Sequence, residues 1–276
     1  MRSVHASRPV PLDDTDPFRP SRGRPVRVRS RSMAADAHFD PHRHPWAQLA
    51  YCATGIVQVS AAAPDRSHGD VTYIVPPSRA VWIAPQALHS VHVLEAAEFR
   101  TLYVDASVTP AGWSGCRALV VSPLLRELVP ALDEAGLPRS REALLTALVL
   151  EELASAPAQP LGVPLPPAQT GDKRLRALCE AVLRAPAQRG TLARWAADVG
   201  ASERTMARLF REQLGTSYQQ WRLQAVLAHA LPLLARGTPV SQVAAASGYA
   251  SDSAFTAMFK AAMGQPPSRF LGRVAG

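Results

Sequence analysis

The sequence has no long apolar runs and few cysteines. No stretch of about 18 consecutive apolar residues occurs in the 276 residues, which excludes a transmembrane helix. No apolar segment follows the first Arg, so a secretory signal is not expected. The 3 cysteines, Cys52, Cys116 and Cys179, are far apart and form no CxxC pair. This pattern excludes a disulfide framework and a zinc ribbon, and it fits a reducing cytoplasm.

The formal net charge of +8 is unevenly distributed along the chain. Residues 33–171 carry 8 Arg against 13 acidic residues, whereas residues 172–276 carry 14 basic residues against 6 acidic ones. Cationic side chains gain free energy by releasing counterions from phosphates, so the basic C-terminal third suggests a polyanionic partner. The alternative is a plain solubility charge in an Arg-rich proteome, because only 2 of the 30 cations are Lys.

Changes in composition and periodicity divide the N-terminal two thirds into four segments. Residues 1–32 hold 8 Arg and few apolar residues, which predicts a disordered basic arm. Residues 33–121 contain short β-branched or aromatic runs that predict a small barrel or sandwich, with a turn at Gly55. The expected strands lie within Gln48–Ser60, Val71–Val75, Ala80–Ile83, Ser90–Leu94 and Phe99–Val104.

Residues 122–155 show helical spacing of leucines and valines in two stretches, each beginning near a Ser. Two such amphipathic helices can pack back on the sheet domain or form a dimer seam. Residues 156–171 are rich in Pro and nearly uncharged, which predicts a semi-stiff linker between two domains.

The last hundred residues contain an internal repeat. LARWAADVG matches VSQVAAASG at an offset of 48, and SERTMARLFREQLG matches SDSAFTAMFKAAMG at an offset of 49. Each copy has the pattern of a helix-turn-helix: a small residue at the helix crossing, a Gly in the turn, a Ser cap and a buried stripe. The two units are expected at about residues 191–212 and 239–261, joined by one long helix over Tyr218–Leu234.

The region 172–276 resembles the DNA-binding domain of the AraC/XylS family of transcription regulators. The resemblance rests on ASERTMARLFREQLGTS in the first unit and VAAASGYASDSAFTAMFKAAMGQPPSRF in the second. It implies an all-α domain that binds double-stranded DNA in the bacterial cytoplasm, with the second helix of each unit in the major groove.

The two expected reading helices differ in their exposed side chains. Arg204 and Arg208 lie four residues apart on one helical face, and each can contact guanine O6 and N7, bind phosphate, or pair with Glu203. Ala257 occupies the position equivalent to Arg208, so sequence specificity is expected mainly from the first unit. The candidate DNA-binding residues are Ser202, Glu203, Arg204, Ala207, Arg208, Arg211, Ser251, Asp252, Ser253, Thr256 and Lys260.

A histidine pattern in the N-terminal domain resembles the cupin motifs HxH-x₃-E-x₆-G and P-x-G-x₂-H. Here Gln48 stands in place of the acidic ligand, and the candidate metal ligands are His42, His44, His89 and Gln48. Imidazoles suit Zn, Ni, Cu or Fe. The alternative is a metal-free pocket for an organic effector, with Trp46, Tyr51, Arg79 and Trp82 as candidate walls, although aromatic core residues give the same signal.

The sequence therefore predicts a DNA-binding transcription regulator controlled by a small-molecule or metal effector in a cupin-like domain. It is expected to be a homodimer and to act by altering DNA binding or contact with RNA polymerase. The alternative is a metal-dependent cupin enzyme fused to a helical DNA-binding domain. The missing carboxylate at Gln48 and the absence of a Ser-His-Asp, Cys-His or P-loop pattern argue against catalysis.

Overall fold

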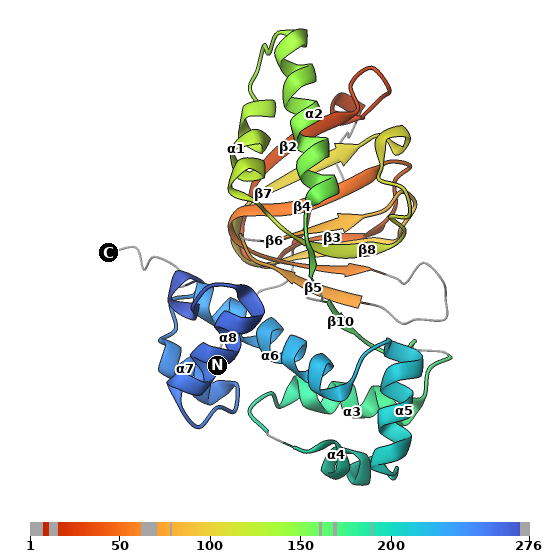
Figure 1. Ribbon diagram of the computed structural model, residues 1–276, viewed down its shortest axis with the longest axis vertical. Coiled ribbons are helices and arrows are strands. Elements are labelled where there is room, and N and C mark those ends of the chain that lie inside the picture. Colours follow the sequence, from red (N-terminus) through yellow and green to blue (C-terminus); the bar gives the residue numbers. More distant parts are fainter. Residues whose placement is uncertain are drawn as a thin grey trace. The chain divides into compact units, whose positions relative to one another are not determined.

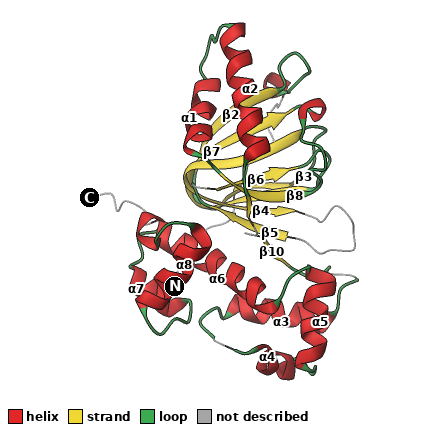
Figure 2. Cartoon of the chain, in the orientation of Figure 1, coloured by secondary structure: helices red, strands yellow, loops and turns green. Residues whose placement is uncertain are grey.

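The computed structural model describes residues 8–10, 16–61, 71–77, 79–159, 162–167, 170–188 and 190–270. The chain divides into two compact units: an N-terminal unit of residues 1–64 and 73–160, and a C-terminal unit of residues 65–72 and 161–276. Strands dominate the first and helices the second, which confirms the predicted fold class of a β domain followed by an α domain (Figures 1 and 2).

The N-terminal unit is built on one sheet in which β7 is the central strand. One edge of β7 pairs with β4, and its other edge pairs with β3 at the start and with β2 at the end. The strands are β1 Arg8–Pro9, β2 Val26–Met33, β3 Ala37–His42, β4 Ala47–Ala61, β5 Val71–Val75, β6 Arg79–Ile83, β7 His89–Val104, β8 Cys116–Val120 and β9 Ala158–Gln159.

Two long strands replace shorter predicted ones. The prediction of a turn at Gly55 is wrong. Strand β4 continues through Gly55, and its register with β7 shifts in the surrounding residues. Gly55 has φ +76°, and a Cβ there would meet the Ala96 oxygen at 2.2 Å, so the glycine permits a bulge and a close backbone approach. The two strands expected between Ser90 and Val104 are likewise one strand, β7.

The prediction of a disordered arm over residues 1–32 is wrong for its C-terminal part. Val26–Met33 forms β2, paired antiparallel with the end of β7. Alternation explains the strand, because Val26 and Val28 are buried in an apolar cluster while Arg29 and Arg31 point to the opposite face. Residues 1–7 and 11–15 of the predicted arm lie outside the described residues.

Two helices, α1 Pro123–Leu132 and α2 Arg139–Ser155, pack on the face of the sheet that carries Val26 and Val28 (Figure 1). The Ser122 hydroxyl caps α1 by accepting a hydrogen bond from the Leu125 amide at 2.9 Å. The helices bury Leu125, Val129 and Val149 against the sheet. The buried residues of both helices thus serve the N-terminal core, whereas Leu124, Leu144 and Leu148 are exposed.

Among the described residues, the C-terminal unit contains the short strand β10 Gly162–Pro164, six α-helices and a 3-10 helix over Pro267–Phe270. The segment 156–171, expected to be a linker, also includes β9, so part of it is ordered strand. The helices are α3 Lys173–Arg184, α4 Leu192–Asp198, α5 Glu203–Leu214, α6 Tyr218–Ala235, α7 Val240–Ala246 and α8 Asp252–Met263.

Helix pairs α4–α5 and α7–α8 are two copies of one helix-turn-helix. Both turns hold a glycine with positive φ, +68° at Gly200 and +80° at Gly248. Both second helices start at a capping serine, Ser202 or Ser251, and end at a left-handed glycine. Helix α6, of 18 residues and therefore about 27 Å long, joins the two copies.

Candidate functional site

The strand register places several polar side chains together on the face of the sheet opposite α1 and α2. Arg29 pairs with Thr101 across β2 and β7, Arg31 pairs with Phe99, and Gln48 of β4 pairs with Tyr103. Cross-strand partners point to the same face, so these residues share one chamber. The chamber has a free volume of about 30 Å³, and it is lined by Arg29, Arg31, Phe39, His42, Gln48, Val91, Phe99, Thr101 and Tyr103.

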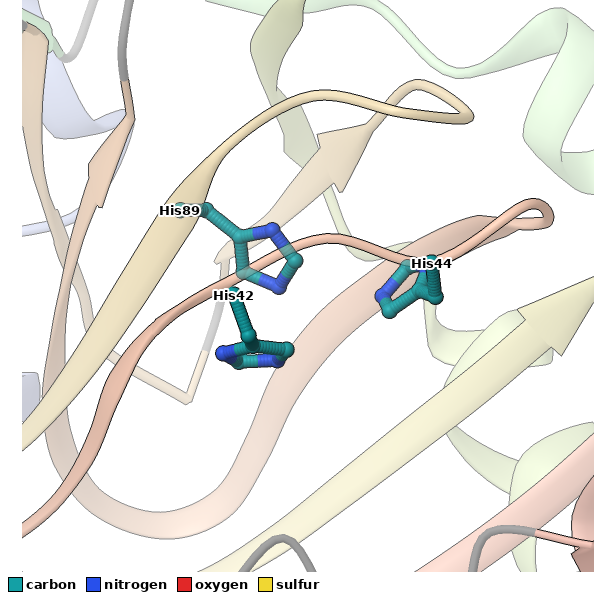
Figure 3. Close-up of side chains that lie close together, drawn as sticks. All are labelled: His42, His44 and His89. Carbon is teal, nitrogen blue, oxygen red and sulfur yellow. The ribbon is translucent and has the colours of Figure 1, made fainter.

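Three of the predicted site residues lie together at one end of this chamber. His42 at the end of β3 pairs with His89 at the start of β7, and His44 follows in the connection to β4. One ring nitrogen of each lies within 4.8 Å of those of the other two, as three neighbouring imidazoles in Figure 3. His92 is outside this cluster and its Nε2 lies 4.0 Å from Asp36.

Backbone carbonyls set the orientation of all three rings. Each Nδ1 lies within hydrogen-bond distance of a carbonyl oxygen: His42 with Asp40 at 2.8 Å, His44 with Trp46 at 2.7 Å and His89 with Ala87 at 2.9 Å. An Nδ1–H that donates to a carbonyl leaves Nε2 with a free lone pair.

The three Nε2 atoms are suited to metal binding. The Nε2 of His89 is buried and has no hydrogen-bond partner among the described residues, whereas the Nε2 of His44 lies 2.7 Å from the side-chain amide of Gln48. In a neutral His44 whose Nδ1–H donates to Trp46, this Nε2 is an acceptor, so its partner is the NH₂ group of the Gln48 amide in the flipped orientation. Burial lowers the pKa of His42 and His44, and it lowers the pKa of His89 to about 3, so the rings are neutral at pH 7. Three neutral imidazoles and an amide oxygen fit Zn, Ni, Cu or Fe as a divalent ion.

The four residues predicted as effector-pocket walls lie in three different environments. Trp46 stacks on the His44 ring, with centroids 5.3 Å apart, so it borders the histidine cluster. Tyr51 and Trp82 belong to the apolar cluster under α1 and α2, and are therefore core residues rather than walls of this chamber. Arg79 is 4% exposed and also lies outside the chamber lining.

Sequence reasoning missed Arg29 and Arg31, the two cations of the chamber. Arg31 stacks over the Phe39 ring at 5.2 Å, and Arg29 hydrogen-bonds to Tyr103. The signal that identifies them is the alternation of Val or Ser with Arg in VRVRSRS, which is a strand pattern despite its high charge.

Helix α5 displays the predicted first reading face. Met206, Leu209 and Phe210 are buried, while Arg204, Arg208 and Arg211 are exposed on the other side. Arg208 pairs with Glu212 at 2.5 Å, one turn further on, rather than with Glu203. An exposed pair of this kind contributes little stability, so Arg208 can exchange this partner for a nucleic acid at small cost.

A surface hollow adjoins α5 and brings further residues to the same area. Glu203, Ala207 and Arg211 line it, together with Arg222 and the α6 cap Ser217. Arg222 donates hydrogen bonds to the carbonyls of Pro186 and Gln188, so it also holds the loop before α4. The hollow thus holds Arg211 and Arg222 together with the acidic Glu203, whereas Arg204 and Arg208 lie outside its lining.

Helix α8 displays a different face on the same scaffold. Asp252, Ser253, Ala257 and Lys260 are exposed and Thr256 is half-buried. Phe255 and Phe259 are buried at positions equivalent to Met206 and Phe210. The second copy thus presents one cation where the first presents three.

A sheet domain with a small hollow beside a histidine cluster, followed by two helix-turn-helix units with exposed cations, is the architecture of a regulator with a ligand-binding domain and a DNA-binding domain. An AraC-like ligand binding domain matches residues 24–209 and a helix-turn-helix domain matches residues 195–273. The chain belongs to the AraC family and is a transcription regulator with a ligand-binding domain and a DNA-binding domain.

Two relatives and one solved structure are similar to this chain. The HTH-type transcriptional regulator NimR of Escherichia coli (strain K12) is 32% identical over 255 residues, which cover 86% of this chain and 92% of NimR. RipA of Corynebacterium glutamicum is 33% identical over 108 residues, 39% of this chain and 32% of RipA. ToxT from Vibrio cholerae is 12% identical and covers 91% of this chain and 100% of its own, with a TM-score of 0.37. No described helix has both the length and the apolar character needed to cross a bilayer.

Proposed function

We propose that the regulator reads its operator mainly through α5, with α8 anchoring the protein to the DNA backbone. The observation that carries this proposal is the contrast between the two exposed faces, Arg204 and Arg208 in α5 against Ser253 and Ala257 in α8. Arginine in the major groove reads guanine with two hydrogen bonds, whereas a short side chain cannot. Ser202, Ser251, Thr256 and Lys260 complete the proposed contacts to the DNA backbone, and Asp252 is proposed to accept from a base amine because its carboxylate is repelled by phosphate.

Arg204→Ala tests base readout. DNA preferred by the full-length protein is first selected from a random library, and Kd is then measured for this DNA and for unrelated DNA. Loss of a base contact weakens binding to the selected DNA by about tenfold to a hundredfold and changes nonspecific binding little. The control is Arg184→Ala, which removes an exposed cation from α3. Equal losses on both DNAs would show that Arg204 binds phosphate only.

We also propose that the chamber of the N-terminal unit is the effector site and holds a divalent metal through His42, His44 and His89, with Gln48 as a fourth donor. The orphaned Nε2 of buried His89 and the three carbonyl-fixed Nδ1 atoms support this assignment. The metal supplies a Lewis-acidic cation that can bind an effector. Protein purified without chelator is expected to carry about one metal per chain by elemental mass spectrometry.

Two variants make the metal measurement decisive. His44→Ala removes one donor and is expected to abolish stoichiometric metal. His92→Ala removes a histidine outside the cluster and is expected to leave the ratio unchanged. If the wild-type protein is purified without metal and also fails to bind added Zn, Ni or Co, the metal site is refuted. The remaining hypothesis is then a metal-free effector pocket.

The exposed leucines of α1 and α2 support a homodimer. Leu144 and Leu148 are 69% and 47% exposed, on the face of α2 opposite the buried Val149 and Leu153, and Leu124 of α1 is 47% exposed. Exposed leucines at helical spacing suit a helix–helix seam between two copies. Leu144→Glu with Leu148→Glu is expected to yield monomers in sedimentation analysis, while Leu183→Glu on α3 is expected to have no effect.

We infer a regulatory rather than catalytic role, exerted in the cytoplasm by altering DNA binding or contact with RNA polymerase. The free thiols Cys52, Cys116 and Cys179 are compatible with that compartment. The alternative, a metal-dependent enzyme, has its metal-ligand set but no carboxylate among the described residues that line the chamber. Consumption of an organic substrate by iron-loaded protein would favour the enzyme.

A further inference from the structure

The two helix-turn-helix units have separate apolar cores. Among the described residues, the cluster of the first unit includes Met206 and Phe210 of α5 and Trp221 of α6, but no buried residue of α7 or α8. Helix α6 leads on to α7 through a four-residue turn, residues 236–239, in which Gly237 has φ +77°. A glycine leaves such a turn several allowed conformations, so the turn alone does not fix the angle of α7. The placement of α8 relative to α5 therefore depends on further contacts.

The loop that joins α3 to α4 contacts the second unit directly. A Cβ on Gly248, in the turn between α7 and α8, would lie 2.4 Å from the oxygen of Ala187 and 3.0 Å from its carbonyl carbon. A residue with a side chain does not fit at this distance, so the glycine allows the two backbone segments to touch. The α3–α4 loop thus lies against the turn that precedes α8.

Two side chains of α6 fasten the same loop to the first unit. The Nη2 atom of Arg222 donates hydrogen bonds to the carbonyl oxygens of Pro186, at 3.4 Å, and Gln188, at 3.2 Å. The hydroxyl of Tyr218 donates to the carbonyl oxygen of Gly190 at 2.9 Å. These acceptors lie on both sides of the residue that approaches the second unit, so the loop is held at the point where it meets that unit.

The surroundings of Arg222 indicate that its side chain serves the loop. Its Nε is buried and has no hydrogen-bond partner among the described residues. A buried donor without a partner destabilises a fold, and the bonds from Nη2 to the loop offset that cost. Lysine at this position keeps a charged donor on a long stem and can replace part of the contact, whereas methionine keeps the stem and donates nothing.

Two reading helices bind one DNA molecule together only if their separation matches that of their half-sites. Successive half-sites lie about 34 Å apart, and each added base pair moves a half-site by about 3.4 Å along the DNA axis and about 34° around it. A rigid connection between two binding modules favours one separation, whereas a loose connection gives similar affinity at several. Rigidity at the α3–α4 loop is therefore expected to appear as selectivity for half-site spacing.

We propose that Arg222 is a positioning residue that sets the half-site spacing of the operator. It fixes the α3–α4 loop between the two units, and the loop fixes the turn at Gly248 and hence the placement of α8 relative to α5. Arg222 acts through the loop and reads no base itself. This inference rests on the proposed DNA contacts of α5 and α8.

The test uses full-length protein and the DNA that it selects from a random library, after a base-by-base scan has located the two half-sites. Kd is measured for this DNA, for versions with one or two base pairs inserted or deleted between the half-sites, and for DNA that keeps only the α5 half-site. The wild type is expected to lose at least about tenfold in affinity at each altered spacing. Arg222→Met is expected to lose less than about threefold, with unchanged affinity for the single half-site.

Three further variants assign the effect to the loop. Tyr218→Phe removes the hydroxyl that bonds to Gly190 without changing the charge, and it is expected to relax the spacing selectivity in part. Arg222→Lys is expected to keep part of the wild-type selectivity. Arg184→Met, the matched control, removes an exposed cation of α3 that pairs with Glu180, and it is expected to leave the spacing profile unchanged. Circular dichroism verifies each fold, and Tyr218→Phe decides the question if Arg222→Met does not fold.

The outcomes separate this inference from the proposed function. A folded Arg222→Met protein with the wild-type spacing profile overturns the inference, and so does an equal loss on the full site and on the single half-site. A wild type that reads both half-sites but tolerates every spacing also overturns it, and leaves the readout by α5 and α8 intact. A wild type that reads one half-site only refutes the proposed role of α8 and this inference together, while Arg204→Ala tests α5 independently.

Discussion

The two helix-turn-helix units share a scaffold and differ in what they display. Both have a small buried residue at the helix crossing, Ala196 or Ala244, a left-handed glycine and a serine cap. The exposed face of α5 carries three arginines, whereas that of α8 carries a single lysine. The residues that fix the backbone are the same in type in both units, whereas the exposed residues of α5 and α8 differ. The fold and the proposed DNA readout therefore depend on separate positions in each helix.

Making α5 resemble α8 has the largest expected effect. Arg204→Ser with Arg208→Ala installs the residues found at the equivalent positions of α8. Two lost base contacts of about 1–3 kcal/mol each weaken binding to the selected DNA by about 2–6 kcal/mol. Fluorescence anisotropy measures Kd, and circular dichroism verifies the fold. A change no larger than that of Arg184→Ser would contradict base readout by α5.

Substitution by alanine should destabilise the protein by different amounts at the two turn glycines, Gly200 and Gly248. A Cβ at Gly248 would lie 2.4 Å from the Ala187 oxygen, whereas no atom lies within 4 Å of one at Gly200. Gly200→Ala should cost about 1–2 kcal/mol of unfolding free energy from its positive φ alone. Gly248→Ala should cost more than about 3 kcal/mol because a backbone clash is added. Chemical denaturation measures both, and equal costs would refute the steric difference.

The serine caps should be equivalent in the two copies. Ser202 accepts from the Thr205 amide at 3.1 Å, and Ser251 accepts from the Ala254 amide at 3.2 Å. Replacing either with Ala should cost about 1 kcal/mol of unfolding free energy. Denaturation midpoints of the two variants test this, and a cap that costs nothing in one copy would show that the scaffolds differ after all.

Introducing arginines at the α5-equivalent positions of α8 should change DNA binding less than removing the arginines from α5. Ser253→Arg with Ala257→Arg adds two exposed cations to the second reading face. If they reach phosphates, the plot of log K against log salt becomes steeper by up to about 1.8, at about 0.9 for each contact. Salt-dependent binding to unrelated DNA measures this slope. An unchanged slope would indicate that α8 does not face the DNA.

Local signals were enough to predict the C-terminal unit. Caps, turn glycines and buried stripes lie within a few residues of one another, so a duplicated pattern predicts the fold directly. The histidine cluster was also predicted, from the cupin-like motif that contains His42, His44 and His89. The strand on which the prediction placed both His42 and His44 ends at His42, so His44 reaches the cluster from the connection to β4.

The rest of the N-terminal unit depended on contacts distant in sequence. The bulge at Gly55 looks like a turn until β7 is known to approach it. Arg29 and Arg31 look like part of a charged arm until β2 is paired with a strand some 70 residues later. Tyr51 and Trp82 were predicted to be pocket walls, but the strand register places them in the apolar cluster under α1 and α2.

A base-by-base scan of the selected DNA tests the unequal readout by α5 and α8 most directly. Each base pair is changed in turn, and the binding free energy of the full-length protein is measured. Two clusters of sensitive positions are expected, about one helical turn apart. One cluster should lose about 1–3 kcal/mol per change and lose this sensitivity in Arg204→Ser with Arg208→Ala, while the other shows much smaller losses. Two equally sensitive clusters, or a pattern unchanged in that variant, would contradict the account.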